Sequence, residues 1–84
     1  MIKPNPHMLR AGYALATDVA DALSKSPATI ARLCEAEAIE HIRDGGAVYV
    51  KLSSLLEHYD SNVVYANEIK KLIAKVKRES KEAG

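Results

Sequence analysis

The sequence predicts a mainly α-helical fold with a small β-hairpin, an α+β arrangement around one small core. At 84 residues the chain has room for one domain. Apolar residues recur at helical spacing in several segments, which predicts helices. One segment has two adjacent glycines followed by β-branched and aromatic residues, which predicts the hairpin. The chain has no Phe and no Trp. Its core must therefore come from Leu, Ile, Val and Ala, which favours close helix packing.

Residues 1–12 are expected to form a flexible N-terminal arm. Two prolines flank Asn5, and prolines so closely spaced oppose regular structure. The first helix is expected from Asp18 to about Ser24, with Thr17 as its N-cap, because a threonine before an acidic first turn is a typical helix start.

A second helix is expected from Pro27 to about Glu37. Ser26 is a suitable N-cap, and proline is tolerated at the first helical position. Its inward stripe consists of Ile30, Leu33 and Cys34. Because few residues separate the two helices, they are predicted to form a helix-turn-helix. Cys34 stands in the middle of this helix among apolar neighbours, so we expect it to be a small buried side chain. A metal site is not expected, because one cysteine and three scattered histidines do not supply the spacing of metal ligands.

The segment after the second helix is predicted to form a β-hairpin of residues 40–43 with residues 47–51. The "DGG" between the two runs favours a tight turn, because glycine tolerates positive φ. Residues 13–61 would then form the main domain, with a third helix, "LLEHYD", capped by Ser53 or Ser54.

The C-terminal segment, residues 62–84, is predicted to contain a long helix from Val63 to about Glu79. Its apolar residues follow a short heptad pattern. They are Tyr65, Ile69, Leu72, Ile73 and Val76. This stripe is interpreted either as a dimerisation surface or as a cap on the core, and the small size of the domain favours dimerisation slightly.

The predicted order of elements resembles the winged helix-turn-helix domains of the MerR and phage excisionase families. The resemblance covers residues 15–59, roughly half of the chain. Its first motif, "V-A-x-x-L", is Val19, Ala20 and Leu23; its second, "S-x-x-T-I-x-R", is Ser26, Thr29, Ile30 and Arg32. It implies a winged helix-turn-helix with a long C-terminal helix. It also implies a DNA-binding regulator or an architectural factor, with its second helix in the major groove.

The resemblance also implies which residues contact double-stranded DNA. They are Lys25, Ser26, Ala28, Thr29, Arg32, Arg43, Gly45, Gly46 and Lys51. Arg32 is the candidate for reading a base, because its planar fork suits guanine. The hairpin residues would brace the wing on the DNA backbone or minor groove. We expect the four cations of this set to share one surface, facing the same way as the start of the second helix.

The charge distribution limits the affinity that one copy can reach. Residues 12–61 hold four basic and eight acidic side chains, whereas residues 62–84 hold six basic and three acidic ones. Four to six phosphate contacts bind weakly at physiological salt, so a homodimer or a cooperative array on DNA is expected. Without a signal peptide or a long apolar run, we expect a cytoplasmic, nucleoid-associated protein with no membrane, cofactor, metal or small-molecule partner.

Two other function classes are weighed against DNA binding. One is a protein-interaction adaptor that uses the C-terminal helix and has little affinity for DNA. This interpretation leaves Arg32 without a DNA contact, and its alternative role is then a surface ion pair with Glu35 or Asp21. An enzyme is not expected, because the sequence has no nucleophile–base arrangement, phosphate loop or paired carboxylates.

Overall fold

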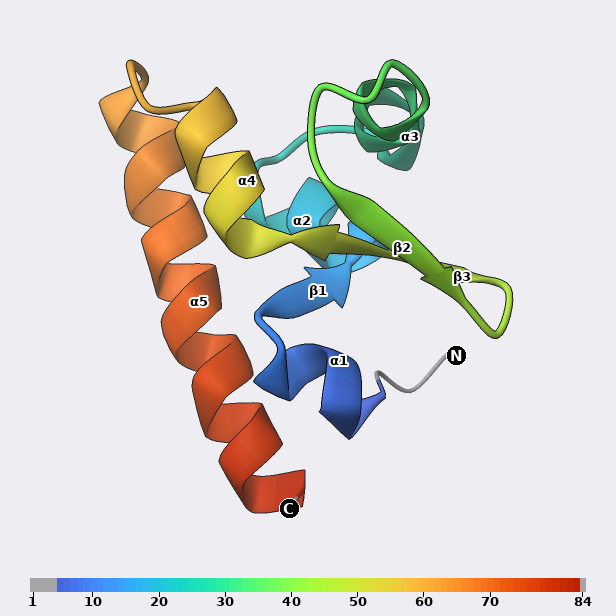
Figure 1. Ribbon diagram of the computed structural model, residues 1–84. Helices are drawn as coiled ribbons and strands as arrows, with labels where there is room; N and C mark the ends of the chain where they lie inside the picture. The colour runs from blue at the N-terminus through green and yellow to red at the C-terminus, as the bar shows by residue number, and fades with distance from the viewer. Residues whose placement is uncertain (1–4, 84) are drawn as a thin grey trace.

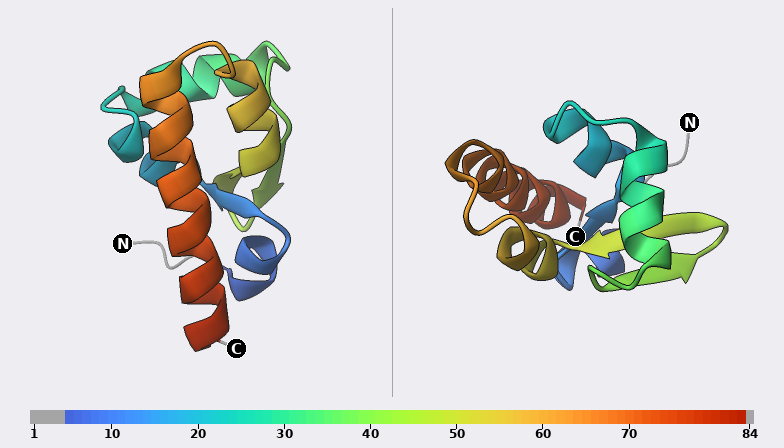
Figure 2. Two further views of the ribbon diagram at one scale, coloured as in Figure 1. Left: turned by 90° about the vertical axis from the view of Figure 1, so that its left-hand side faces the viewer. Right: turned by 90° about the horizontal axis from the view of Figure 1, so that it is seen from above.

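The computed structural model describes residues 5–83, with side-chain surroundings described up to residue 79. Five helices and three strands form a mainly helical α+β fold, as predicted (Figure 1). In chain order they are α1 (Pro6–Arg10), β1 (Tyr13–Leu15), α2 (Ala16–Ala22), α3 (Pro27–Glu35), β2 (His41–Asp44), β3 (Ala47–Lys51), α4 (Leu52–His58) and α5 (Val63–Ala83). Seen from above, α5 and α3 lie on opposite sides of the molecule (Figure 2).

The sheet is antiparallel and has the strand order β1-β3-β2. The β2–β3 hairpin confirms the predicted one, with β2 shifted by one residue to begin at His41. Strand β1 was not predicted. It has three residues, too few for a visible alternation of apolar and polar side chains, and it pairs Leu15 with Tyr49 of the central strand.

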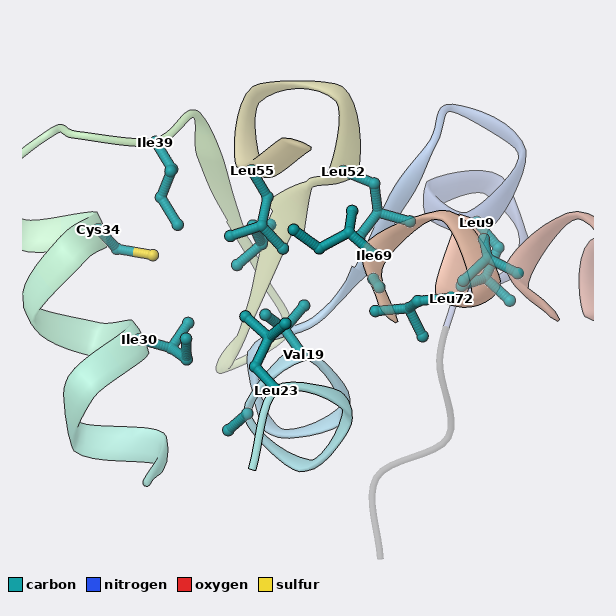
Figure 3. Packing of buried hydrophobic residues seen from close by; sticks show 14 residues of the cluster. Leu9, Val19, Leu23, Ile30, Cys34, Ile39, Leu52, Leu55, Ile69 and Leu72 are labelled. Carbon is teal, nitrogen blue, oxygen red and sulfur yellow. The ribbon is translucent and has the colours of Figure 1, made fainter. Parts of the chain in front are cut away.

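One aliphatic core joins residues from all five helices and from the sheet (Figure 3). Its largest fully buried side chains are Val19, Ile30, Val50, Leu52, Leu55 and Ile69. A second, smaller cluster of Leu15, Ala47 and Tyr49 includes partly buried Met8 and Tyr13. Tyr49 thus buries an aromatic ring in the interior, where only Leu, Ile, Val and Ala were expected.

The N-terminal segment is not a flexible arm within the described residues, and this prediction was wrong. Asn5 caps α1 by accepting a 2.9 Å hydrogen bond from the backbone N–H of His7. Pro6 stands in the first turn, where the absent N–H is not needed. Leu9 is buried, and α1 packs against α5. Residues 1–4 of the predicted arm lie outside the described part.

Helix α2 begins two residues before the predicted start. Leu15 occupies its N-cap position with no side-chain cap, so Thr17 lies inside the helix and does not cap it. The reason is the unpredicted strand: β1 leads directly into α2, and Leu15 is fixed by its pairing with Tyr49.

Helix α4 begins in the same way, directly after a strand. Lys51 is at its N-cap position, so the predicted caps Ser53 and Ser54 are helical residues. Ser54 has a different role, because its Oγ accepts a 3.0 Å hydrogen bond from the backbone N–H of Glu40. It thereby ties α4 to the segment that enters the hairpin.

Helices α2 and α3 end in the same left-handed turn without glycine. Ser24 has φ 54° and Glu37 has φ 57°, in the region that favours glycine. After α3, the N–H of Glu37 donates to the carbonyl of Cys34, and the N–H of Ala38 donates to that of Leu33. This is the Schellman arrangement. It ends α3 at Glu35, two residues earlier than predicted.

The apolar stripe of α5 packs on the chain's own core. Ile69, Leu72 and Val76 are 0%, 7% and 4% exposed. Tyr65 and Ile73 are partly buried against the same core. Of the two interpretations given for this stripe, the packing favours the cap on the core over the dimerisation surface. The helix also runs beyond the predicted end, to Ala83. Among the described residues, no helix combines the length and apolar character needed to cross a bilayer.

Candidate nucleic-acid interface

The junction of α2 and α3 is a short turn that fixes the start of α3. The Oγ of Ser26 accepts a hydrogen bond of 3.3 Å from the backbone N–H of Thr29, which confirms Ser26 as the N-cap. The two hydroxyl oxygens of Ser26 and Thr29 also lie 3.0 Å apart, within hydrogen-bond distance. Both predicted contact residues thus have a structural role, while Ser26 stays exposed.

Helix α3 has one buried face and one exposed face. Ile30 and Cys34 point into the core and are 0% and 4% exposed. The exposed side carries Ala28, Ala31, Arg32 and Glu35, which neighbour one another at spacings of three and four residues. We call these four residues the α3 face. Ala28 and Ala31 have small side chains, so the surface of a partner molecule can approach the helix backbone closely beside Arg32.

The β2–β3 hairpin brings Arg43 to the edge of the α3 face. Arg43 pairs with Val48, and directly opposed residues of an antiparallel pair project to the same side of the sheet. Val48 packs against the main core, so this side faces α3. Arg43 accordingly shares the lining of a small hollow of about 80 Å³ with Ala31 and Glu35. Arg32 and Arg43 therefore flank one exposed surface.

The hairpin tip holds Gly45 and Gly46, both exposed, with φ of 59° and 82°. Two successive residues with positive φ are typical of a tight turn that needs glycine. The neighbouring Asp44 accepts a 3.0 Å hydrogen bond from Nδ2 of Asn5. The tip is thus held by its own turn and by the start of α1.

Lys51 lies on the other side of the sheet. It pairs with Tyr13 and follows Tyr49 at the alternate position, and both tyrosines belong to the second cluster. Its Nζ is 3.0 Å from Oε2 of Glu40. This contact raises the pKa of Lys51 above its ordinary value, mainly through the hydrogen bond to Glu40 and to a lesser extent through the negative charge of Glu40. Lys51 does not join the α3 face.

Lys25 also turns away from the α3 face, although it belongs to the turn before α3. Its Nζ lies 4.8 Å from the ring centroid of Tyr65 and 6.0 Å from that of Tyr59. Hydrogen bonding to Tyr65 is the main reason why the pKa of Lys25 is raised. The lysine thus makes a cation–π contact with α5 and the end of α4. The prediction that four cations share one surface was wrong, because only Arg32 and Arg43 do.

The electrostatics of the α3 face are close to balanced. Arg32 and Arg43 are exposed and form no ion pair in the described part of the chain, so Arg32 is not paired with Glu35 or Asp21. Glu35 contributes the one negative charge of the surface. Behind the face, burial raises the pKa of the Cys34 thiol, and the charge of Arg43 opposes the shift. Cys34 is thus a buried packing residue, as predicted.

Two members of this surface, Ala31 and Glu35, were missing from the sequence-based set. The signal was available, because both lie one turn from Ala28 or Arg32 on the same helix. Among residues 5–83, no group of three or more histidine, cysteine or acidic side chains is placed to hold a metal ion. Comparison with protein-family models, with curated proteins and with solved structures finds no match to the chain.

Proposed function

We propose that the protein binds double-stranded DNA by placing α3 in the major groove. The observation that carries this proposal is the exposed α3 face, where the small side chains of Ala28 and Ala31 lie beside Arg32, with Arg43 at its edge; neither arginine forms an ion pair with the described residues. The order of α2, turn, α3, hairpin and α4 agrees with the winged helix-turn-helix that the sequence resembles. A major groove about 12 Å wide admits a helix with such a face.

Each residue of the surface has a role that follows from its chemistry. Arg32 offers two parallel donors to the edge of a guanine. Ala28 and Ala31 present methyl groups, which make apolar contacts with the methyl group of thymine. The hydroxyls of Ser26 and Thr29 can donate to phosphate. On the hairpin, Arg43 contacts the backbone, and the glycine turn at 45–46 permits close approach.

The proposal includes binding by two copies. The proposed contacts place one cation, Arg43, on the phosphate backbone, so one copy binds weakly, with a salt slope of about −0.9 from that contact. A pair of copies on half-sites about 34 Å apart, or a cooperative row, gains by multivalency. Because the apolar stripe of α5 is buried, contact between copies on DNA has to use other surfaces.

A salt-series titration with matched charge variants tests this proposal. Fluorescence anisotropy is measured with labelled duplexes of random and of genome-derived sequence. We expect Arg32→Ala to weaken binding by about 1–3 kcal/mol, with a loss of sequence preference. Arg43→Ala should make the dependence of the logarithm of affinity on the logarithm of salt concentration shallower by about 0.9. The control Lys51→Ala removes the same charge from the other side of the sheet and should change neither quantity. Equal losses for Lys51→Ala and Arg32→Ala would contradict the proposal.

The alternative function, an adaptor that binds partners through the C-terminal helix, has less support. It needs an uncovered apolar stripe on α5, and that stripe packs on the core. If the titration detects no binding of any duplex at low salt, the adaptor interpretation gains and DNA binding fails.

A further inference from the structure

The hollow of about 80 Å³ between α3 and β2 is lined by a histidine to which the DNA contacts proposed above give no role. We call it the α3–β2 hollow. His41 shares its lining with Ala31 and Glu35 of α3 and with Arg43 of its own strand. These three side chains are exposed, whereas His41 is half-buried. The hollow therefore opens onto the edge of the α3 face, and His41 lies beside that surface.

Strand geometry places His41 on the same side of the sheet as Arg43. The two residues are separated by one position, and alternate residues of a strand project to the same side. Their partners on β3 agree with this. His41 pairs with Val50, Arg43 pairs with the alternate Val48, and both valines pack in the main core. His41 and Arg43 thus form a short row beside α3, on the opposite side from Lys51.

A hydrogen bond orients the ring of His41. Its Nδ1 lies 3.3 Å from the backbone carbonyl oxygen of Ile39. Because a carbonyl oxygen can only accept, this contact requires a proton on Nδ1, and Nε2 is then the atom that takes up the second proton. The ring can therefore become positively charged and keep the same orientation.

Few charged groups face His41. Those that line the hollow with it are the carboxylate of Glu35 and the guanidinium of Arg43, and the third titratable group there is the buried thiol of Cys34. The lining residues from α2 and β3 are apolar. The neighbouring Glu40 is held in an ion pair on the other side of the sheet. Among the described side chains His41 itself forms no ion pair, so its positive charge is available to a ligand.

We propose that His41 is a proton-dependent DNA contact: when its ring is charged, it pairs with a phosphate next to the one that Arg43 contacts. This inference rests on the proposed binding of DNA by the α3 face. Histidine is the side chain whose charge changes between about pH 5 and 8. Charging His41 adds a second hairpin cation on the phosphate backbone. The affinity for DNA therefore rises as the pH falls through this range, while the sequence preference set by Arg32 is unchanged.

The test is a salt-series titration of the whole chain with labelled duplex, followed by anisotropy at several pH values between about 5.5 and 8. We expect the affinity at the lowest pH to exceed that at the highest by about three- to fivefold, which is the effect of one exposed ion pair. The dependence of the logarithm of affinity on the logarithm of salt concentration should become steeper by up to about 0.9.

Variants assign the effect to His41. His41→Gln should lose the gain in affinity at low pH, whereas His41→Lys carries a fixed charge and should bind with an affinity that does not change over this range. The control His58→Gln removes an exposed histidine of α4 outside the hollow and should keep the whole gain. His7→Gln, at an exposed position of α1, should keep it as well.

A further variant distinguishes a direct contact from an indirect one. A charged His41 that paired only with Glu35 would raise the affinity by neutralising that carboxylate. Glu35→Gln removes this route, so the gain at low pH should persist in it. NMR of the unaltered chain gives a measurement that needs no variant. The ring resonances of His41 should titrate at higher pH with duplex present than without it, because the coupling between proton and DNA binding is reciprocal.

The outcomes separate this proposal from DNA binding itself. Binding of duplex with an affinity that stays constant between about pH 8 and 5.5 would overturn the role of His41 and leave the α3 face in place. A gain that persists in His41→Gln, or one that Glu35→Gln abolishes, would also overturn that role. No binding of any duplex at low salt and at every pH would overturn both proposals.

Discussion

Helices α3 and α5 are both amphipathic, yet the structure uses them in opposite ways. Helix α5 buries Ile69, Leu72 and Val76 and turns a charged face outward. Part of that outer charge is paired, for example Lys71 with Glu68 at 3.2 Å. Helix α3 buries only Ile30 and Cys34 and exposes the small side chains of Ala28 and Ala31 beside Arg32, which forms no ion pair with the described residues. The stronger apolar stripe thus packs on the core, whereas the outer side of α3 remains exposed.

The sequence left two interpretations of the α5 stripe open, a cap on the core and a dimerisation surface, and the N-terminal helix α1 bears on the choice between them. When residues 1–12 are taken as an arm, α5 has more apolar surface than the remaining elements can cover. Helix α1 supplies the missing cover, because it packs along α5 and buries Leu9 there. A heptad-like spacing shows that a stripe is buried, but it does not distinguish burial within one chain from burial between two.

The largest expected effect tests whether α5 is a core element. Ile69→Ala removes a side chain that is 0% exposed. It should lower the free energy of unfolding by about 2–5 kcal/mol, because transfer and cavity effects add. Denaturant titration measures this, with Ile69→Val as a milder variant that loses about 0.5–1.5 kcal/mol. If the stripe were instead a dimer seam, the stability of the unaltered protein would rise with its concentration.

The next effect concerns the end of α3. Glu37→Gly should raise the free energy of unfolding by about 1 kcal/mol, since a non-glycine residue in the left-handed region costs about that much. For a domain of this size the melting temperature should rise by about 4–8 °C. Ala36 next to it has φ −78°. Ala36→Gly is therefore the matched control and should lower stability. A loss of stability in Glu37→Gly would show that this turn is not formed as described.

A smaller effect tests what the α3 face reads. Replacing thymine by uracil in a bound duplex removes only the methyl group that Ala28 and Ala31 are proposed to contact. Loss of one buried methyl is worth about 0.8 kcal/mol, or roughly a fourfold change in affinity. Anisotropy with matched thymine and uracil duplexes measures it. Unchanged affinity at every substituted position would remove the alanines from base recognition.

The smallest effect concerns Glu35, the negative charge on the α3 face. Glu35→Gln should strengthen DNA binding by about 0.5 kcal/mol, roughly twofold, because it removes repulsion of phosphate at an exposed, screened site. Glu57→Gln makes the same change on an exposed position of α4 and should have a smaller effect. Equal gains would mean that only net charge matters and that the α3 face has no special position on the DNA.

Local chemistry made part of the structure predictable. The Ser26 cap, Pro27 in the first turn of α3 and the glycine turn of the hairpin all follow from rules that act over a few residues. The starts of α2 and α4 were missed because each follows a strand directly, so sheet pairing sets the boundary and no capping side chain is needed.

The candidate surface was only half predictable for a similar reason. Sequence position placed Lys25 and Lys51 near α3 and the hairpin, but side-chain direction depends on distant partners. Tyr65 draws Lys25 towards α5, and alternation along β3 sends Lys51 to the far side of the sheet. Neither Tyr65 nor the sheet face could be assigned before the packing of α5 and β1 was known.

The most direct test of this account is an amide chemical-shift map of the ¹⁵N-labelled chain titrated with duplex DNA at low salt. The account predicts that shifts concentrate in residues 26–35 and 43–46, with residues 70–78 of α5 little changed. The basic outer face of α5 offers the opposite result. If residues 70–78 shift while α3 stays unchanged, the exposed α3 face is not the DNA-binding surface.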